Sequence, residues 1–471
     1  MPTAAPAAAP FASDIKFIKQ YSVVYYPHVR TVILSDNSIE LYADYKREKT
    51  MKKLLITSLL LSLVTMFGCS SPKTSSENSQ SATSSAETTS EAEPTTVEKK
   101  IYDYVHGEEG YFNLLEEFPE IETNEQDGGT CWLFSAANSM ETAYVLKNGS
   151  YITIDPTKML DRIYLDEKEE GFFPKEGFSG KNLGGWQWMV TDTLSNGFGE
   201  LTIDSSVILD IDDREAIKDN LRTRGGVSIG VNDTENKFKG WYGKYYTLNY
   251  TREEFDHDIT IIGYDDHFPK EYFTIPAAED GAWITYNSLY PSGYFYVSYC
   301  APLEYGISHS VTNEYSEVIG YDAGNEQDRY IQTGDYTTTA NVFHNAGKLA
   351  AVGTYNDFDE QDIKIEVYDS SFSNLLYSKD AVLNYHGYHT VVLDTPIDVT
   401  DCAVAITYSK GAPVEGETID YGDTNYVTKA ESGQSFVKLD TVWRDLTEEG
   451  IENELGLDFK AGNCCIKALY A

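Results

Sequence analysis

Basic residues are scarce in this chain of 471 residues, which has 36 Lys and Arg against 75 Asp and Glu and a formal net charge of −39. A surface this acidic repels nucleic acid and anionic lipid, so neither is an expected partner. Bound calcium would be another use of the acidity, but no loop has the Asp and Gly pattern of an EF-hand. A hydrophobic content of 41%, with 13% aromatic residues, still allows two or three packed domains.

Cysteine is rare as well, which excludes a small scaffold held together by many disulfides. The chain has six cysteines: Cys69, Cys131, Cys300, Cys402, Cys464 and Cys465. One bridge between Cys402 and either Cys464 or Cys465 is one interpretation. Buried free thiols are the equal alternative, because cysteine packs well as a small apolar residue.

Long hydrophobic runs are nearly absent, and the clearest one lies in residues 51–69, MKKLLITSLLLSLVTMFGC. Two lysines precede an apolar stretch of about a dozen residues, which is too short for a membrane span but suits a secretory signal. The segment is similar to bacterial lipoprotein signals. That resemblance implies cleavage before Cys69 and lipidation of its thiol, with simple cleavage or an uncleaved anchor as the alternatives.

The segments on either side of this signal carry no predicted catalytic function. Residues 1–50 precede a signal that normally begins a protein, so we interpret them as a mis-called N-terminal extension, a genuine cytoplasmic extension being the alternative. Residues 70–99 are rich in Ser, Thr and Glu and almost free of large apolar side chains. Such a composition cannot bury enough surface to fold and predicts a flexible tether.

Two different patterns follow the tether. Residues 100–315 mix helix and strand signals and predict an α+β domain. Residues 316–471 show short alternating runs, such as 363–369, 389–394 and 402–409, separated by Gly, Asp, Asn and Pro. Short strands at this spacing predict an all-β sandwich. The boundary between the two domains is expected near residues 312–322.

The segment from 126 to 149, QDGGTCWLFSAANSMETAYVLKNG, carries the strongest chemical signal. Gly128 and Gly129 break the chain, Thr130 is a candidate cap, and the residues after it have helical periodicity. Cys131 is therefore expected at the N-terminus of a buried helix, where the helix dipole favours a thiolate. An isolated cysteine in such a place is more often a core residue, but an upstream Gln and a following Trp favour a nucleophile.

This segment resembles the papain-like cysteine peptidases, in which a Gln and a glycine turn precede Cys-Trp-x-Phe-Ser at a helix start. The resemblance implies a domain with a helical lobe and a β-barrel-like lobe, with Cys131 as nucleophile and Gln126 in the oxyanion hole. It also implies that Trp132 takes part in substrate binding. The spacing from Gln126 to Cys131 is one residue shorter than the family's usual spacing.

The same resemblance supplies the other members of a catalytic triad. His257 lies in DHDITIIGYDD, which is similar to the family's His-containing strand, and Asn287 lies in GAWITYNSLYPSGYFYVSY, which is similar to its Asn-Ser-Trp segment. His257 is the implied base and Asn287 the residue that orients it. Asp258 replaces the usual small residue after the histidine, and Leu289 replaces the usual Trp. Taken alone, His257 and Asn287 would each be interpreted as an ordinary turn residue.

Further segments complete the resemblance, which covers roughly residues 100–310. Gly184 and Gly185 match the family's glycine pair, where a peptide substrate lies against the backbone. Beyond the peptidase-like part, SGQSFV (432–437), Trp443 and NCCIKALY (463–470) resemble the lectin-like sandwich found in some bacterial surface proteins. A sandwich does not itself imply sugar binding, and a structural or docking module is the alternative.

The sequence therefore predicts a secreted or surface-anchored cysteine endopeptidase, located on the outer face of a bacterial membrane. Its expected partners are a peptide or protein substrate and a carbohydrate or cell-wall ligand for the sandwich, with membrane contact only through the lipid anchor. No cofactor and no metal are expected. The alternative is a decayed papain-like scaffold that serves as an adhesin, and amide or acyl transfer by the same residues is a third interpretation.

Overall fold

The structure is a computed structural model that describes residues 29–35, 38–43, 104–121, 124–165, 171–175, 179–242, 245–289, 294–325, 329–416, 419–420 and 424–471. The chain divides into two compact units, Met1–Thr89 and Ser90–Ala471. In the first unit the described residues form one antiparallel hairpin, β1 (Val29–Ser35) with β2 (Ser38–Ala43). The predicted signal, the tether and Cys69 lie outside the described residues.

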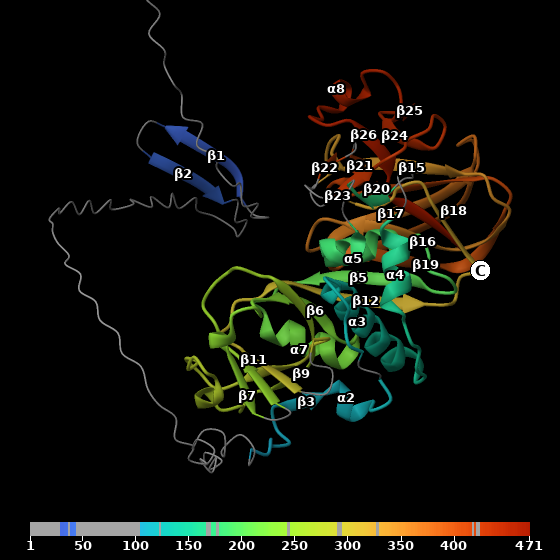
Figure 1. The fold of residues 1–471 in the computed structure, drawn as a ribbon. Helices are drawn as coiled ribbons and strands as arrows, with labels where there is room; N and C mark the ends of the chain where they lie inside the picture. The colour runs from blue at the N-terminus through green and yellow to red at the C-terminus, as the bar shows by residue number, and fades with distance from the viewer. Residues whose placement is uncertain are drawn as a thin grey trace, which may run out of the picture. The chain divides into compact units, whose positions relative to one another are not determined.

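Helices are concentrated in the first half of the second unit (Figure 1). They are α2 (Leu114–Glu117), α3 (Cys131–Asn148), α4 (Pro156–Ile163), α5 (Gly180–Leu183), α6 (Gln187–Leu194), α7 (Arg214–Thr223) and α8 (Ile451–Leu455), with 3-10 turns η1 (Asn236–Phe238) and η2 (Lys270–Tyr272). Asp155 and Asp213 cap α4 and α7 through their side chains, and the left-handed Gly149 ends α3.

Strands outweigh helices in the described residues. Before residue 313 they are β3 (Tyr111–Asn113), β4 (Gly171–Pro174), β5 (Thr202–Leu209), β6 (Val227–Val231), β7 (Lys239–Tyr242), β8 (Tyr245–Leu248), β9 (His257–Asp265), β10 (Ala282–Tyr286), β11 (Tyr294–Ser298) and β12 (Glu304–Thr312). After it come β13 (Glu317–Gly320), β14 (Tyr330–Ile331), β15 (Thr337–Phe343), β16 (Gly347–Asn356), β17 (Gln361–Asp369), β18 (Leu375–Leu383), β19 (His386–Val399), β20 (Cys402–Tyr408), β21 (Ala412–Gly416), β22 (Ile419–Asp420), β23 (Thr424–Val427), β24 (Ser435–Leu439), β25 (Val442–Asp445), β26 (Ala461–Cys464) and β27 (Ile466–Tyr470).

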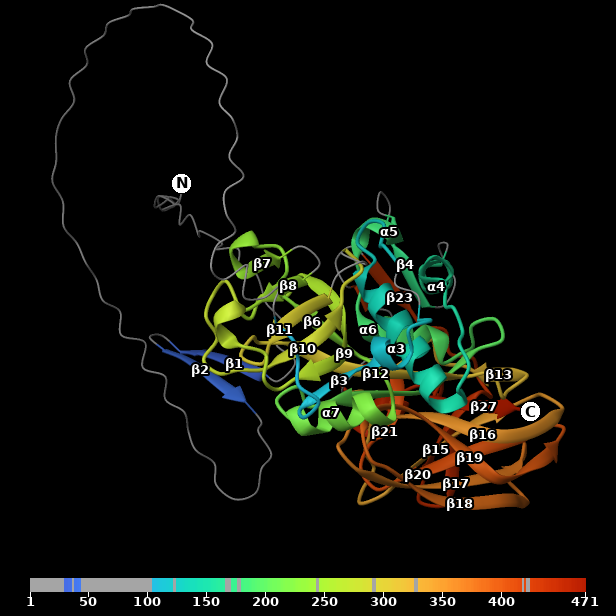
Figure 2. The ribbon, with the colours of Figure 1, turned by 90° about the horizontal axis from the view of Figure 1, so that it is seen from below.

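One large sheet crosses the expected boundary between the two domains. Its order is β13-β27-β16-β19-β5-β12-β6-β9-β10-β11-β8-β7, with β3 added beside β9. The crossing is the antiparallel pairing of β19 with β5, in which His386 lies opposite Ile208. A second link pairs β23 with β4. Figure 2 shows the C-terminal strands β16 to β20 on one side of the helices and β7, β8 and β11 on the other.

Three hydrophobic cores fill the second unit, and one of them is shared between its N-terminal and C-terminal parts. One core lies among β6, β9, β10 and β11, and a second fills the C-terminal sandwich between its two layers of strands. A third surrounds α3, α4 and α6 and includes Tyr355 of β16, Tyr388 of β19 and Cys465, which lies between β26 and β27. Because apolar burial is the main stabilising term, the helices and the sandwich depend on each other for stability.

The C-terminal cysteines are buried free thiols, not bridged ones. Cys402, Cys464 and Cys465 are each 0% exposed and unpaired with sulfur. Burial raises the pKa of the Cys464 thiol to about 12, which makes it a poor nucleophile. Of the two interpretations left open by the sequence, the structure supports buried thiols that pack as small apolar residues.

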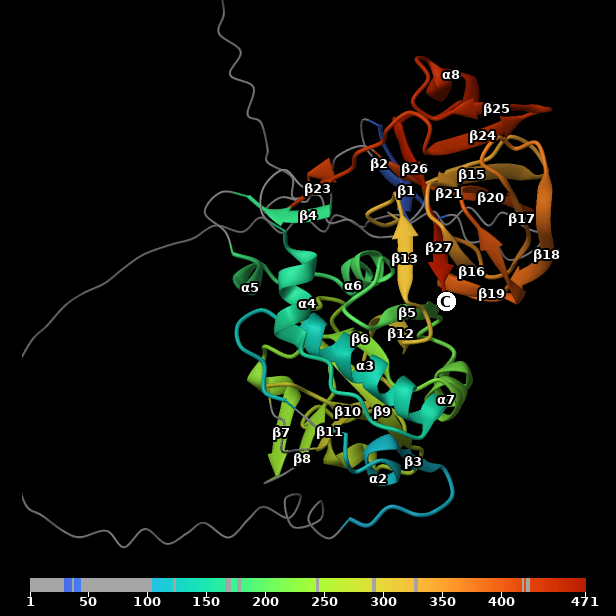
Figure 3. The same cartoon turned by 90° about the vertical axis from the view of Figure 1, so that its right-hand side faces the viewer.

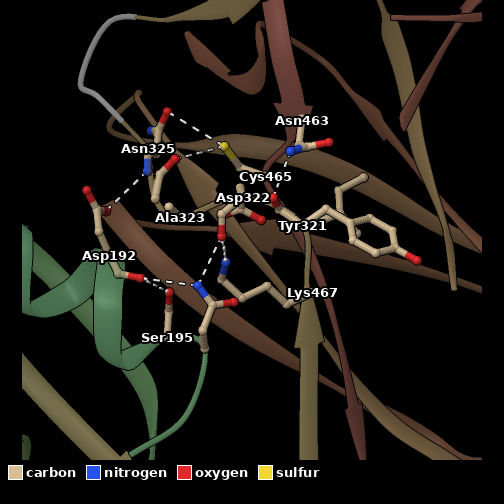
Figure 4. Close-up of polar contacts among 12 residues, drawn as sticks. Asp192, Ser195, Tyr321, Asp322, Ala323, Asn325, Asn463, Cys465 and Lys467 are labelled. Atoms are coloured by element: carbon tan, nitrogen blue, oxygen red, sulfur yellow. Dashed lines mark hydrogen bonds and ion pairs between the residues drawn. The ribbon is translucent and has the colours of Figure 1, made fainter. Parts of the chain in front are cut away.

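A buried polar network joins the helical part to the sandwich (Figure 4). Lys467 of β27 forms an ion pair with Asp322, with 2.5 Å between Nζ and Oδ2 and both side chains fully buried. Asp192 of α6 accepts hydrogen bonds from the backbone N–H of Asn325 at 3.1 Å and from the Tyr355 hydroxyl at 3.1 Å. Figure 3 shows β13 and β27, which carries Lys467, side by side. Burial raises the pKa of both carboxyls, and the Lys467 ammonium opposes that rise.

Candidate active site

Cys131 is the first residue of α3, as the sequence predicts. The preceding turn needs Gly128 in the left-handed region, at φ 74°, where glycine carries no steric penalty. Thr130 occupies the N-cap position, but its hydroxyl donates to the Asp127 carbonyl at 3.0 Å and does not cap the helix. The expected side-chain cap is therefore wrong, and the first N–H groups of α3 are left to act on the cysteine sulfur.

Two hydrogen bonds fix the start of α3 against β9, the strand that begins with His257. The Ser135 hydroxyl donates to the Ile259 carbonyl at 2.7 Å, and the Thr260 hydroxyl donates to the Ser135 carbonyl at 3.1 Å. Ser135 lies one helical turn after Cys131, and Ile259 lies two residues after His257. The backbone N–H of Asp258 also forms a hydrogen bond with the Cys131 sulfur. The thiol and the imidazole therefore come from adjoining ends of two packed elements.

The His257 ring is held in one tautomer by Asn287, which directly follows β10. His257 Nε2 lies 2.9 Å from Asn287 Oδ1, and both residues are buried. The same Oδ1 accepts the backbone N–H of Leu289 at 3.0 Å, which identifies it as the amide oxygen. Since an amide oxygen only accepts, Nε2 must carry a proton. Nδ1 of the neutral ring is then an acceptor for a proton from elsewhere.

The Cys131 thiol resists ionisation when considered alone. Burial raises its pKa to about 12, the Asp258 carboxylate adds to the rise, and hydrogen bonds from the backbone N–H groups of Asp258, Trp132 and Cys131 act in the opposite direction. At neutral pH an unassisted Cys131 would carry almost no thiolate. Nucleophilic chemistry at this position therefore depends on a base that takes the thiol proton.

The Gln126 side chain is tied to the segment that carries Asn287. Its Oε1 accepts the Ser288 hydroxyl at 2.6 Å, and its backbone N–H donates to the Ser288 carbonyl at 3.1 Å. Its Nε2 donates to the Gly128 carbonyl at 2.9 Å, which leaves one amide hydrogen for a second acceptor. These bonds place Gln126 beside the glycine turn before Cys131, although the spacing from Gln126 to Cys131 is one residue shorter than in the family.

The glycine pair lies against the Trp132 ring. A Cβ on Gly185 would come within 2.4 Å of Trp132 Cε2 and Cζ2, whereas a Cβ on Gly184 would meet nothing within 4 Å. Gly184 has φ +77°, and its carbonyl accepts the Tyr164 hydroxyl at 2.9 Å. Trp132 is fully buried, so its side chain supports the glycine pair from beneath and does not itself face a substrate. Trp186, the next residue, is 41% exposed and stacks on Trp188.

The two glycines are expected to respond differently to alanine. Gly185→Ala drives a methyl group into the rigid Trp132 ring and should lower the free energy of unfolding by about 2–3 kcal/mol. Gly184→Ala meets only backbone strain and should cost about 1 kcal/mol. Urea denaturation of both variants measures the difference. Equal losses would show that the close packing of Gly185 on Trp132 is not present in solution.

Three residues of this region escaped sequence reasoning. Ser288 binds Gln126, Gln187 donates to the Trp132 carbonyl at 2.9 Å, and the Tyr305 hydroxyl donates to Asp258 Oδ1 at 2.6 Å. Only Ser288 lies inside a quoted motif. Gln187 and Tyr305 reach the site from α6 and β12, and no local pattern marks them. Leu289, the residue expected in place of the family's Trp, is 42% exposed.

Neither a metal cluster nor a spanning helix occurs among the described residues. No group of three His, Cys, Asp or Glu side chains lies close enough to hold an ion there. His389 Nε2 donates to the Tyr385 carbonyl at 2.7 Å, and His386 Nε2 lies 3.9 Å from Asp357 Oδ1. The helices that the structure describes are all too short or too polar to cross a bilayer.

Comparison with known proteins adds the family context. A family model of the lectin-like domain matches residues 321–470. Digestive cysteine proteinase 3 from Homarus americanus is 21% identical over 184 residues, covering 34% of this chain and 54% of its own length. Cathepsin F from Drosophila melanogaster is 23% identical over 206 residues, covering 40% of this chain and 33% of its own. The chain thus spans about half or less of the length of these curated relatives.

Solved structures agree with the fold over a larger part of the chain. A clostridial cysteine protease, Cwp84 after propeptide cleavage, superposes with a TM-score of 0.62 at 16% identity, covering 76% of this chain and 98% of its own. The protease and lectin-like domains of Cwp84, a surface layer associated protein of Clostridium difficile, superpose with a TM-score of 0.61 at 16% identity, covering 76% and 88%. The chain is therefore similar to the papain-like cysteine peptidases and has the fold of one followed by a lectin-like domain.

Proposed function

We propose that this chain is a cysteine endopeptidase that acts outside the cell through Cys131, His257 and Asn287. The observation that carries the proposal is the buried bond between His257 Nε2 and Asn287 Oδ1, at 2.9 Å, beside a cysteine at a helix start. This bond leaves Nδ1 as the proton acceptor, which is the role that a buried thiol of high pKa requires. A binding scaffold would have no need for one fixed tautomer.

The reaction then follows from the residues present. His257 Nδ1 takes the Cys131 proton, and the thiolate attacks the carbonyl carbon of a peptide bond. The oxyanion is stabilised by the N–H groups at the start of α3 and by the remaining Nε2 hydrogen of Gln126. The imidazolium returns its proton to the leaving amine. A water molecule, deprotonated by His257, hydrolyses the thioester and releases the acid product.

The remaining roles belong to the surroundings of this centre. The backbone of Gly184 and Gly185 pairs with an extended peptide substrate, and a two-lobed arrangement places α3 on one wall and β9 and β10 on the other. The signal at 51–69 exports the chain, and lipidated Cys69 anchors it to the outer face of a bacterial membrane. The lectin-like region, residues 321–470, binds a carbohydrate or cell-wall ligand, in keeping with its family. The two domains occupy residues 100–315 and 316–471.

Labelling with a peptidyl epoxide tests the proposal. The full chain is incubated with the reagent, the modified residue is identified by mass spectrometry, and hydrolysis of a fluorogenic protein substrate is followed in parallel. We expect rapid modification at Cys131 that removes hydrolysis. The Cys131→Ala variant should show neither reaction.

Cys300 provides the matched control, because it is a partly exposed free thiol that follows β11 at the end paired with Ala282, the opposite end of β10 from Asn287. Cys300→Ala should keep full labelling and full hydrolysis. If Cys131 is modified no faster than Cys300 in the wild type, the peptidase proposal fails. A scaffold that only binds would then be the better interpretation.

A further inference from the structure

Asp258, the residue after His257, is a buried carboxyl that the reaction above does not use. Its side chain accepts hydrogen bonds from the Tyr305 hydroxyl at 2.6 Å and from Gln187 Nε2 at 3.4 Å. Its backbone N–H forms the hydrogen bond with the Cys131 sulfur. Asp258 thus touches the nucleophile through its backbone while its carboxyl group lies inside the protein, only 7% exposed as a residue.

The donors to this carboxyl are neutral groups that are held in place by further bonds. Gln187 Nε2 also donates to the Trp132 carbonyl at 2.9 Å, and its Oε1 accepts His309 Nε2 at 3.2 Å. Burial lowers the pKa of His309 to about 3, so this imidazole stays neutral near pH 7. The ionised Asp258 therefore faces a phenol and an amide, and its own negative charge is not balanced by either.

Tyr305 reaches Asp258 from a distorted part of β12. Its φ of +26° is unusual for a residue with a side chain, and the register of β12 on β6 shifts between Glu304 and Gly306. A bulge with such a backbone re-aims a side chain at some energetic cost. From this distorted backbone the Tyr305 hydroxyl donates to Asp258 Oδ1.

We propose that Asp258 is a positioning residue whose charge controls Cys131, so that the centre is more reactive with a neutral Asp258 than with an ionised one. This inference rests on the proposed peptidase function. The charged and titratable groups that face the carboxyl are Cys131 from α3 and Glu304 and Tyr305 from β12, with His309 behind Gln187, and His257 precedes it on β9. From β6 the neighbour is Gly230.

The sign of the effect follows from burial and charge. Burial raises the pKa of Asp258 to about 7, and the nearby Glu304 carboxylate adds to the rise. Below pH 7 the carboxyl is mostly neutral, and above pH 7 it gains a negative charge close to the sulfur. That charge raises the pKa of Cys131 and opposes thiolate formation. Removing the charge should therefore let the thiolate form at a lower pH.

The test is the pH dependence of Cys131 alkylation by iodoacetamide, a neutral reagent, in the full chain. Rates at Cys131 are measured by mass spectrometry for the wild type, Asp258→Asn and Asp256→Asn. Asp256 is the matched control, because it adjoins His257 on the other side but is exposed. We expect Asp258→Asn to be alkylated faster than the wild type above pH 7, by up to roughly tenfold, because only the wild-type carboxyl is charged there. Below pH 7 the two profiles should converge, and Asp256→Asn should follow the wild type at every pH.

Tyr305→Phe is the second variant, and it keeps the carboxyl while removing a donor that favours its charged form. Asp258 should then stay neutral to higher pH, which raises the alkylation rate above pH 7 by a smaller amount than Asp258→Asn does. If Asp258→Asn does not fold, the rates of Tyr305→Phe alone test whether the charge of Asp258 controls Cys131. Profiles that superpose on the wild type would overturn the inference alone. Cys131 reacting no faster than Cys300 at any pH would instead overturn the peptidase proposal itself.

Discussion

Replacing His257 with alanine is expected to slow the alkylation of Cys131 at pH 7 by at least about a thousandfold. Without the imidazole, the thiol keeps the pKa of about 12 that burial imposes, and its thiolate becomes a minute fraction of the total. A thiolate of higher pKa is intrinsically more nucleophilic, which offsets part of this loss but not most of it. Peptide hydrolysis should fall by at least as much, because the leaving amine also loses its proton donor.

The control for this experiment is His267→Ala, which removes an exposed histidine shortly after the same strand. This variant should react with iodoacetamide at the wild-type rate. Near-UV circular dichroism of both variants checks that the fold is kept. A His257→Ala protein that is folded and still alkylated rapidly at Cys131 would contradict the assignment of His257 as the base.

Lys467→Met is expected to lower the free energy of unfolding by about 3–5 kcal/mol. The substitution keeps most of the apolar stem but leaves the Asp322 carboxyl buried without its ammonium partner, which otherwise lies 2.5 Å away. Asp192 loses a nearby positive charge at the same time. Because this network joins α6 to β27, the helices should become less stable together with the sandwich.

The loss should depend on pH in a defined direction. Burial holds the pKa of Asp322 above its ordinary value, and Lys467 opposes that rise. Removing Lys467 therefore raises the folded-state pKa further above that of the unfolded chain, so the variant loses stability as pH rises above about 4. Urea midpoints at pH 4.5 and pH 7 should differ more for Lys467→Met than for the wild type.

Two further variants make the result specific. Lys467→Met combined with Asp322→Asn should recover part of the loss, because the uncompensated charge is gone. Lys348→Met removes an exposed lysine of β16 and should change stability by less than about 0.5 kcal/mol. A similar small change for Lys467→Met would mean that water reaches the pair and screens it.

Local patterns predicted the elements that carry the chemistry. The glycine turn and helical periodicity placed Cys131 at the start of a helix, and the apolar run after His257 predicted a strand, which the structure has as α3 and β9. The alternating runs near 363–369 and 402–409 lie in β17 and β20. These predictions succeeded because residue spacing along one element determines which side chains share its buried face. The catalytic roles themselves stay predictions until the variants are measured.

The sequence by itself determined the order of the candidate site residues and the kinds of element that hold them. The tertiary structure decided which distant residues meet: Lys467 with Asp322, β19 with β5, and Tyr305 with Asp258. It also decided the proton position on His257 and the contact between Gly185 and Trp132. The physical reason is that pairing between strands and burial of charge depend on the whole packed core, whereas a helix start or an alternating strand is specified by a few neighbouring residues.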